Sequence, residues 1–510
     1  MASTLKPALD PEQVVKDVIA ALKTPRAPAM LPDIERALRQ APQDARLWHL
    51  KGLIHRSQDR RELAIPALER AAQLAPKLPL IAYGLARTLH EAGLPSVDAY
   101  ARALQITPGD KALLAGLVAA LLAERRIAEA MAGLERALAR SPQWVEGQTL
   151  LSNLRWLEGE RDGFARSFDE ALALHPRDLA LRRQQMITLL HSEHFDEVLA
   201  KIAEGRRVMG DETLFDANEA IAWSETGETA RADELFERLK DLPDSAMQVR
   251  RVRHLLRSDR PEDAAAVIEP WLKTNEAFGF WPYAATAWRM TGDPRSDWLE
   301  GDERFVGIYD IADRLPPLDK LAETLRALHT TKGQPLVQSV RGGTQTDGHL
   351  FQLIDPTIVA LREAIHGIVR EHVAGLPARD PDHPLLAPPL EPIAFSGAWS
   401  VRLQAGGFHS NHVHPMGWIS SALYIALPPD LGHDQAGWLT LGEPRTSSFP
   451  LDLPPTQFIE PRPGRLALFP SWMWHGTRPF GAGERLTVAF DVAVPQRTQP
   501  IQGLDDPIAE

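Results

Sequence analysis

Three histidines in the last hundred residues have the type and the spacing to hold a metal ion. His412 and His414 are separated by one residue in "NHVHPMGW", and His475 follows a strand-like run in "LFPSWMWHGTRPF". In an extended segment, residues two apart point to the same face, so both imidazoles of the pair would point to one side. Neutral imidazole is a ligand for iron, zinc, copper and nickel. The spacing therefore predicts a divalent-metal centre built from His412, His414 and His475.

An arginine at a set distance from the last histidine makes the pattern more specific. Arg485 lies ten residues after His475, in "ERLTVAFDV". A His pair near one strand, a distal His after "FP-x-x-x-x-H" and an Arg about ten residues later resemble the Fe(II)/2-oxoglutarate-dependent dioxygenases. The resemblance covers residues 395–495 and is strongest to the branch with an H-x-H-P pattern. The same stretch is similar to the aspartyl/asparaginyl hydroxylases, some of which join the oxygenase to tetratricopeptide repeats.

The resemblance implies a cofactor, a co-substrate and a role for three more side chains. It implies that His412, His414 and His475 form a catalytic centre that holds Fe(II), with 2-oxoglutarate chelating the metal through its keto-acid end. The far carboxylate of 2-oxoglutarate needs a bidentate cation, and Arg485 would supply it. Thr487, on the same face of the expected strand, would add a hydroxyl donor. Tyr424 lies in the tyrosine-containing strand of the family and would either reach the same carboxylate or serve as a core residue.

One position departs from the family's common pattern of two histidines and one carboxylate. The residue two after His412 is His414, where the family usually has Asp or Glu. The metal would then have three His ligands, which we favour, or His412 and His475 with water in the third place. A third alternative is that His409 substitutes for one of the pair.

The first three hundred residues repeat with a period near 34. Prolines end five similar segments, with separations of 34, 32, 34 and 34, at Pro42, Pro76, Pro108, Pro142 and Pro176. Five residues before each proline is an alanine, and eight before it is a large residue, as in Ala71 and Leu68. The period and the pattern resemble the tetratricopeptide repeat, a helix–turn–helix unit that stacks into a solenoid. We expect this all-α region over residues 11–304, and the resemblance implies that it binds a protein or peptide.

The character of the chain changes after residue 305. Residues 305–394 are expected to be a helical and loop support region, with an amphipathic helix at 356–376. Residues 395–497 contain short strand-like runs separated by Gly and Pro, which favour an antiparallel sandwich or barrel. The predicted fold is therefore multidomain: a tetratricopeptide-like solenoid, followed by an α+β domain whose core is a double-stranded β-helix, or jelly roll.

Composition excludes several kinds of protein. The chain has 510 residues and no cysteine, which excludes disulfides, thiolate catalysis and Cys-ligated metals. Its net charge of −12 argues against nucleic acid as a partner. Neither a secretory signal nor a membrane span is evident, so we expect a cytoplasmic protein without a membrane partner. The basic run "RRVRHLLR" at 250–257 is interpreted as a solvated helix face.

Two classes of function remain. The first is an Fe(II)- and 2-oxoglutarate-dependent dioxygenase, a hydroxylase that consumes molecular oxygen and acts on a protein or peptide side chain delivered by the solenoid. The alternative is a non-catalytic scaffold with a cupin-like metal site. A weaker possibility is an oxygenase acting on a small molecule. A cupin has no need of an arginine ten residues beyond the last ligand, so Arg485 favours the first hypothesis.

Overall fold

The computed structural model describes residues 10–22, 24, 26–330, 339–432, 434–446 and 449–495. Parts of the predicted domains lie outside these residues: 23, 25, 331–338, 433, 447–448 and 496–497. The chain forms two compact units, one comprising Met1–Leu134 with Gly348–Val359 and the other comprising Glu135–Asp347 with Ala360–Gln496. The boundaries predicted above, at 304/305 and 394/395, stay predictions.

The first unit is a stack of helical hairpins. In each repeat, the proline lies two residues beyond the end of the second helix, as Pro108 does after α6. Where the residue two after the proline is an aspartate, as at Asp44 and Asp110, its side chain caps the next helix: Asp110 accepts a hydrogen bond from the backbone N–H of Leu113, at 2.8 Å. At these positions a single P-x-D turn ends one helix and begins the next. The helices are α1 (Pro11–Ala21), α2 (Leu31–Gln40), α3 (Ala45–Ser57), α4 (Arg61–Leu74), α5 (Pro79–Glu91), α6 (Val97–Ile106), α7 (Lys111–Ala123) and α8 (Ile127–Arg140), the last crossing into the second unit.

Glycines let these helices approach closely beside the large residues of the repeat pattern. Leu68 is fully buried, and a Cβ at Gly52 would lie 2.5 Å from its Cγ. Gly116 holds the same relation to the ring of Tyr100 in the next repeats. The solenoid is therefore specified by local packing that recurs with the period of the sequence.

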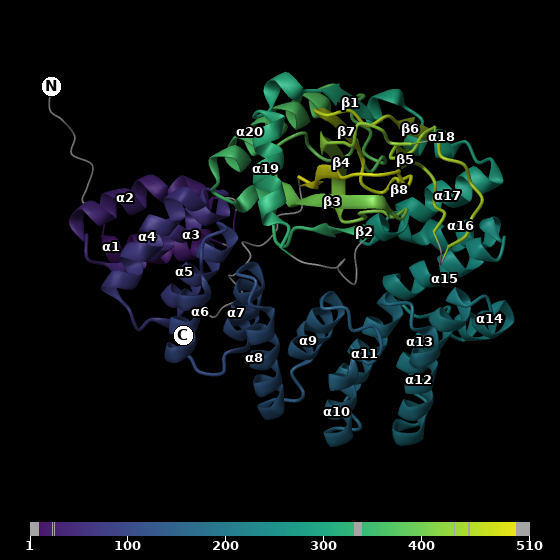
Figure 1. Cartoon of the computed structure of the whole chain (residues 1–510), viewed down its shortest axis with the longest axis horizontal. Helices are drawn as coiled ribbons and strands as arrows, with labels where there is room; N and C mark the ends of the chain where they lie inside the picture. The colour runs from purple at the N-terminus through teal and green to yellow at the C-terminus, as the bar shows by residue number, and fades with distance from the viewer. Residues whose placement is uncertain are drawn as a thin grey trace. The chain divides into compact units, whose positions relative to one another are not determined.

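The second unit continues the solenoid and carries the sheets. Its helices α9 to α14 repeat the hairpin arrangement (Figure 1). The last helices pack on the β-domain: Trp474 donates its indole N–H to Pro282 O at 3.2 Å and to Thr286 Oγ1 at 3.1 Å. The helices are α9 (Val145–Leu157), α10 (Arg166–Leu174), α11 (Leu179–His191), α12 (Phe195–Met209), α13 (Thr213–Glu225), α14 (Thr229–Arg238), α15 (Ser245–Arg257), α16 (Pro261–Ile268), α17 (Trp281–Thr291) and α18 (Arg295–Glu300).

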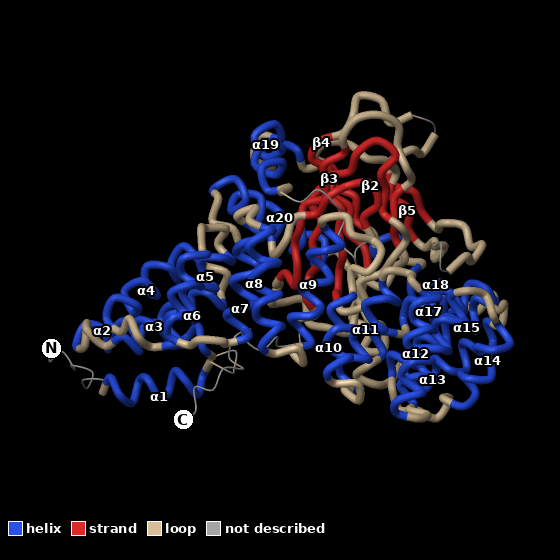
Figure 2. Tube along the Cα trace, turned by 60° about the horizontal axis from the view of Figure 1, so that its bottom comes forward, coloured by secondary structure: helices blue, strands red, loops and turns tan. Residues whose placement is uncertain are grey.

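The β-domain contains two antiparallel sheets, drawn in red in Figure 2. The larger has the strand order β1-β7-β4-β9-β3-β2, and the smaller has the order β6-β5-β8. Two helices accompany them, α19 (Leu318–Leu328), which contacts β4, and α20 (Pro356–Ala374). The strands are β1 (Gly307–Asp310), β2 (Val340–Gln345), β3 (Phe395–His409), β4 (Gly417–Ala426), β5 (Leu439–Leu441), β6 (Gln457–Ile459), β7 (Arg465–Pro470), β8 (His475–Thr477) and β9 (Arg485–Ala493). The predicted fold class, a helical solenoid followed by an antiparallel domain of jelly-roll type, is confirmed.

Among the described residues, no helix is both long enough and apolar enough to cross a membrane.

Candidate active site

The three histidines come from two segments that main-chain hydrogen bonds tie together. His412 and His475 form an antiparallel bridge, in which each backbone N–H donates to the carbonyl of the other, at 2.9 and 3.0 Å. His414 donates its backbone N–H to Ser471 O at 2.9 Å. The His412–His414 segment lies in the connection between β3 and β4, outside any strand. His475 is the first residue of β8. The register between these segments therefore fixes the backbones that carry the three rings.

The imidazole rings of His412, His414 and His475 lie close together. Their candidate ligand atoms all lie within 4.8 Å of one another, and they form the group of His, Asp and Glu side chains that could hold a metal in the described part of the chain. The ring centroids of His412 and His475 are 4.2 Å apart, and that of His414 is 5.0 and 5.1 Å from these two.

Two of the rings are oriented by backbone carbonyls. His412 Nδ1 lies 2.8 Å from Ser410 O, and His475 Nδ1 lies 2.9 Å from Met473 O. A carbonyl oxygen only accepts, so Nδ1 carries the proton in each ring and Nε2 is the unprotonated nitrogen with the lone pair. Such contacts behind a ligand are usual for histidines that bind metals.

The third ring is oriented by a carboxylate. His414 Nδ1 lies 2.6 Å from Asp491 Oδ2, and the Ser420 hydroxyl donates to Asp491 Oδ1, also at 2.6 Å. Asp491 was not among the residues that the sequence singled out. The sequence nevertheless contains an indication of its position. Asp491 is an even number of residues from Arg485 and Thr487 along β9, so the three side chains face the same side of the sheet.

The environment keeps two of the imidazoles neutral. Burial lowers the pKa of His412 well below its usual value, and the neighbouring His475 and His414 lower it further. Burial is also the main cause of the low pKa of His475, with His414 adding to it. Neutral rings are the form that binds a metal.

His409, the alternative ligand, lies beside this group but outside it. Its ring centroid is 6.1 Å from that of His412, and its Nδ1 lies 3.1 Å from the Ser339 hydroxyl. The same hydroxyl lies 3.2 Å from His412 Nε2. Burial and, secondarily, the charge of Arg485 lower the pKa of His409 to about 3. The geometry thus favours His412, His414 and His475 as the ligand set.

Arg485 is a buried cation with unused donors. Its side chain is 2% exposed, and its Nε and Nη1 have no hydrogen-bond partner among the described residues. Burial lowers the pKa of the guanidinium, and Tyr424, whose ring centroid lies 5.0 Å from Arg485 Cζ, opposes this shift. An arginine keeps its proton even so, and a buried charge without a partner is costly. The Arg485 side chain therefore has the charge and the unpaired hydrogen-bond donors needed to bind an anion.

A small cavity connects the arginine with the histidines. It has a volume of about 50 Å³, and the three histidines, Arg485 and Thr487 all line it. Tyr424 lies opposite Thr487 on β4, fully buried, and is not among the lining residues. Its hydroxyl has no hydrogen-bond partner among the described residues.

A second, larger cavity adjoins the first and shares His409, His412 and Thr477 with it. Its volume is about 910 Å³, and part of its wall comes from α15 through Arg250 and Arg253. The interpretation of the 250–257 run as a solvated face is therefore wrong for part of the run. The side chains of Arg253 and Arg257 are only 15% and 11% exposed.

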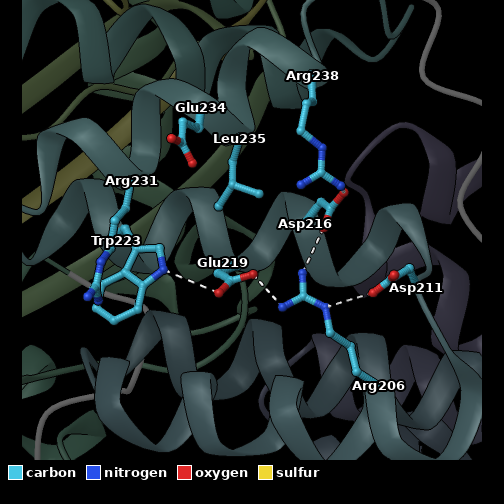
Figure 3. Close-up of a pocket in the computed structure, with 9 residues that line it drawn as sticks. All are labelled: Arg206, Asp211, Asp216, Glu219, Trp223, Arg231, Glu234, Leu235 and Arg238. Atoms are coloured by element: carbon cyan, nitrogen blue, oxygen red, sulfur yellow. Dashed lines mark hydrogen bonds and ion pairs between the residues drawn. The ribbon is translucent and has the colours of Figure 1, made fainter.

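A third cavity, in the repeats, has no comparable chemistry. It lies among α12, α13 and α14 and has a volume of about 420 Å³ (Figure 3). Arg206 in its wall reaches Asp216 at 2.7 Å, Glu219 at 2.5 Å and Asp211 at 3.5 Å. The Arg206 guanidinium already pairs with three carboxylates, so its charge is neutralised within the protein.

Two stretches of the chain match known families. Residues 397–491 match the family described as "Putative 2OG-Fe(II) oxygenase", and residues 97–154 match a tetratricopeptide-repeat family. These two stretches are thus similar to the families that the resemblance predicted. No curated protein matches the chain.

Several solved structures share parts of the architecture at low identity. They include MamA RS-1 (12% identity, 33% of this chain and 97% of that one, TM-score 0.29) and yeast Tom70 (13%, 59% and 68%, TM-score 0.35). A Pseudomonas putida prolyl-4-hydroxylase matches at 18% identity over 37% of this chain and 92% of its own, with a TM-score of 0.25. These likenesses are too weak to carry a functional argument.

Proposed function

We propose that this protein is an Fe(II)- and 2-oxoglutarate-dependent dioxygenase that hydroxylates a protein or peptide side chain recruited by the solenoid. The observation that carries the proposal is one small cavity lined both by three converging imidazoles and by a buried arginine with unused donors. In the balanced reaction, 2-oxoglutarate, O₂ and a substrate C–H group give succinate, CO₂ and a C–OH group.

The donor set fits a divalent metal of this kind. His412, His414 and His475 would hold it through their Nε2 atoms, because each Nδ1 is already engaged with an acceptor. Three protein ligands leave coordination positions for a bidentate co-substrate and for oxygen. When bound, Fe(II) supplies the redox chemistry that couples decarboxylation of 2-oxoglutarate to oxidation of the substrate. A neutral triad holds the metal less tightly than one with a carboxylate. The Asp491 carboxylate, 2.6 Å from His414 Nδ1, brings a negative charge next to the triad and would make His414 a stronger ligand.

Arg485 would bind the far carboxylate of 2-oxoglutarate. A guanidinium and a carboxylate pair through two parallel hydrogen bonds, and Arg485 has at least two buried donors without partners among the described residues. Thr487, on the same face of β9, would donate its hydroxyl to the same carboxylate. Tyr424 packs against the guanidinium and would orient it rather than line the cavity.

The larger cavity supports recruitment of a peptide by the repeats. It adjoins the small cavity, and helices α15 and α17 contribute to its wall through Arg250, Arg253 and Tyr283. A segment held against these helices would be presented next to His412.

Succinate production tests the proposal. The full-length chain is incubated with Fe(II), oxygen and 2-oxoglutarate, with and without candidate peptides, and succinate is measured. We expect turnover by the native chain, none by His475→Ala, and normal turnover by His366→Ala, whose ring lies on α20 beside Phe395. Succinate no higher than that of His475→Ala under every condition would contradict the proposal.

A further inference from the structure

The larger cavity is lined by an excess of positive charge in a protein whose net charge is −12. Five arginines and two glutamates contribute to its wall: Arg250, Arg253, Arg341, Arg445, Arg478, Glu193 and Glu443. The positive charge is therefore a local property of this cavity.

On the solenoid side of the cavity, the Glu225 carboxylate lies within ion-pair distance of three guanidiniums. Glu225 lies 2.6 Å from Arg257 Nη2, 3.3 Å from Arg253 Nη2 and 3.9 Å from Arg250 Nη1. The shortest contact goes to Arg257, which does not line the cavity. The two arginines that do line it hold the longer contacts, and Arg253 Nε has no hydrogen-bond partner among the described residues. This wall therefore retains positive charge that Glu225 does not neutralise.

On the β-domain side, the arginines differ in how well they are paired. Arg478 lies 3.1 Å from Glu443, so one of the two glutamates in the cavity is already matched. Arg445 is 3.6 Å from Asp452, a side chain that is fully exposed, and Arg445 itself is 62% exposed. An ion pair of this length in solvent contributes little. Arg445 therefore lines the same cavity as Arg250 and Arg253 and is a third cation that lacks a firm partner.

We infer that this cavity binds an acidic peptide segment, whose Asp or Glu side chains lie against Arg250, Arg253 and Arg445 while a neighbouring residue reaches the small cavity. The inference names the substrate class and rests on the proposed function. The volume of about 910 Å³ is at the upper end of the range for small-molecule sites, which suits several residues of a peptide. Tyr283, Phe408 and Trp474 in the same wall offer apolar contacts to its backbone and side chains.

Binding of three defined peptides tests the inference separately from catalysis. Decapeptides of alternating Glu-Ala, Gln-Ala and Lys-Ala, each with a neutral fluorophore, are titrated with the full-length chain, and fluorescence anisotropy is measured. The titrations are repeated with Mn(II) and 2-oxoglutarate under nitrogen. We expect the Glu-Ala peptide to bind at least tenfold more tightly than the other two. Its affinity should fall as NaCl rises from about 50 to 300 mM, because salt screens exposed charges.

Two variants and one matched control locate the site. Arg250→Gln and Arg445→Gln should each weaken binding of the Glu-Ala peptide about three- to fivefold, and together about tenfold. Arg251→Gln removes the same charge from the same helix but from a residue that does not line the cavity, and should leave binding unchanged. Equal affinity for the three peptides, or an equal loss in Arg251→Gln, would overturn the inference. If the acidic peptide binds as expected but no succinate forms, the inference about the cavity stands and the proposed activity fails.

Discussion

The Nδ1 atom of His414 and the Oδ2 atom of Asp491 are 2.6 Å apart, although 77 residues separate them in the chain. The contact joins the segment before β4 to the end of β9, and Ser420 holds the other carboxylate oxygen. His412 and His475 are oriented by carbonyls of their own segments, whereas His414 depends on this distant side chain. The geometry of the third imidazole is thus set by the larger sheet.

Replacing this carboxylate tests its role as a positioning group. Asp491→Asn keeps the size of the side chain but removes its charge, so His414 loses a charge-assisted hydrogen bond. We expect metal affinity, measured by calorimetry with Mn(II), to fall about 10- to 100-fold. The 2-oxoglutarate affinity of the metal-saturated variant should change little, because Arg485 is untouched. An unchanged Mn(II) affinity would show that His414 does not depend on Asp491.

Replacing the buried arginine separates function from stability. Arg485→Met removes a buried charge without a firm partner and fills similar space, so the free energy of unfolding should stay equal or rise by about 1 to 3 kcal/mol. The Kd for 2-oxoglutarate should rise about 10- to 100-fold, since a charge-assisted hydrogen-bond pair is lost. Denaturant melts and calorimetry with the Mn(II)-loaded protein measure the two effects.

A strand arginine outside the cavity serves as the control for that variant. Arg465 pairs with Asp310 at 2.7 Å, and Arg465→Met should lower stability while leaving 2-oxoglutarate binding intact. The opposite assignment, with binding lost in Arg465→Met and kept in Arg485→Met, would refute the role given to Arg485.

A glycine keeps the two histidine-bearing segments in register. A Cβ at Gly476 would overlap Asn411 Oδ1 and lie 2.9 Å from His409 O, so Gly476→Ala must push the segment of His412 away from His475. We expect turnover to fall on the order of tenfold or more without the loss of any ligand. Gly481→Ala, whose added Cβ would be 3.5 Å from its nearest neighbour, should keep normal turnover. Similar activities for the two variants would argue against the bridge as a determinant of the site.

Glu300, at the end of α18, gives stability a pH dependence. Burial raises its pKa from 4.5 to about 7, against the opposing charge of Arg289. The folded state therefore binds a proton more tightly than the unfolded state, so the associated stability is complete below about pH 4.5 and is lost as pH rises through about 7. Glu300→Gln should be more stable than the native chain by about 1 to 3 kcal/mol at pH 8 and nearly equal to it at pH 5. Melts at both pH values measure this, and a stability difference that does not vary with pH would exclude Glu300 as its source.

The parts of the structure that are set locally could be predicted from the sequence. The hairpins follow from residues within one repeat, such as Pro108 ending α6 and Asp110 capping α7. The pairing of His412 with His475 was accessible because both flank strand-like runs and because Arg485 follows at a familiar distance.

The remaining features depend on contacts between distant segments. Asp491 looks like an isolated acid in an apolar strand until the sheet brings it to His414. Arg250 and Arg253 look like part of a solvated helix face, and only the packing of the last helices on the β-domain turns them toward the cavity. The helical period alone cannot distinguish a face in solvent from one that faces a neighbouring domain.

The most direct test of the central claim is anomalous diffraction from crystals soaked with Mn(II) and a non-reactive amide analogue of 2-oxoglutarate. We expect one anomalous peak about 2.1 Å from the Nε2 atoms of His412, His414 and His475, with the far carboxylate of the analogue paired with Arg485. The absence of a peak among these rings, a peak that His414 does not contact, or an analogue bound away from Arg485 would contradict it.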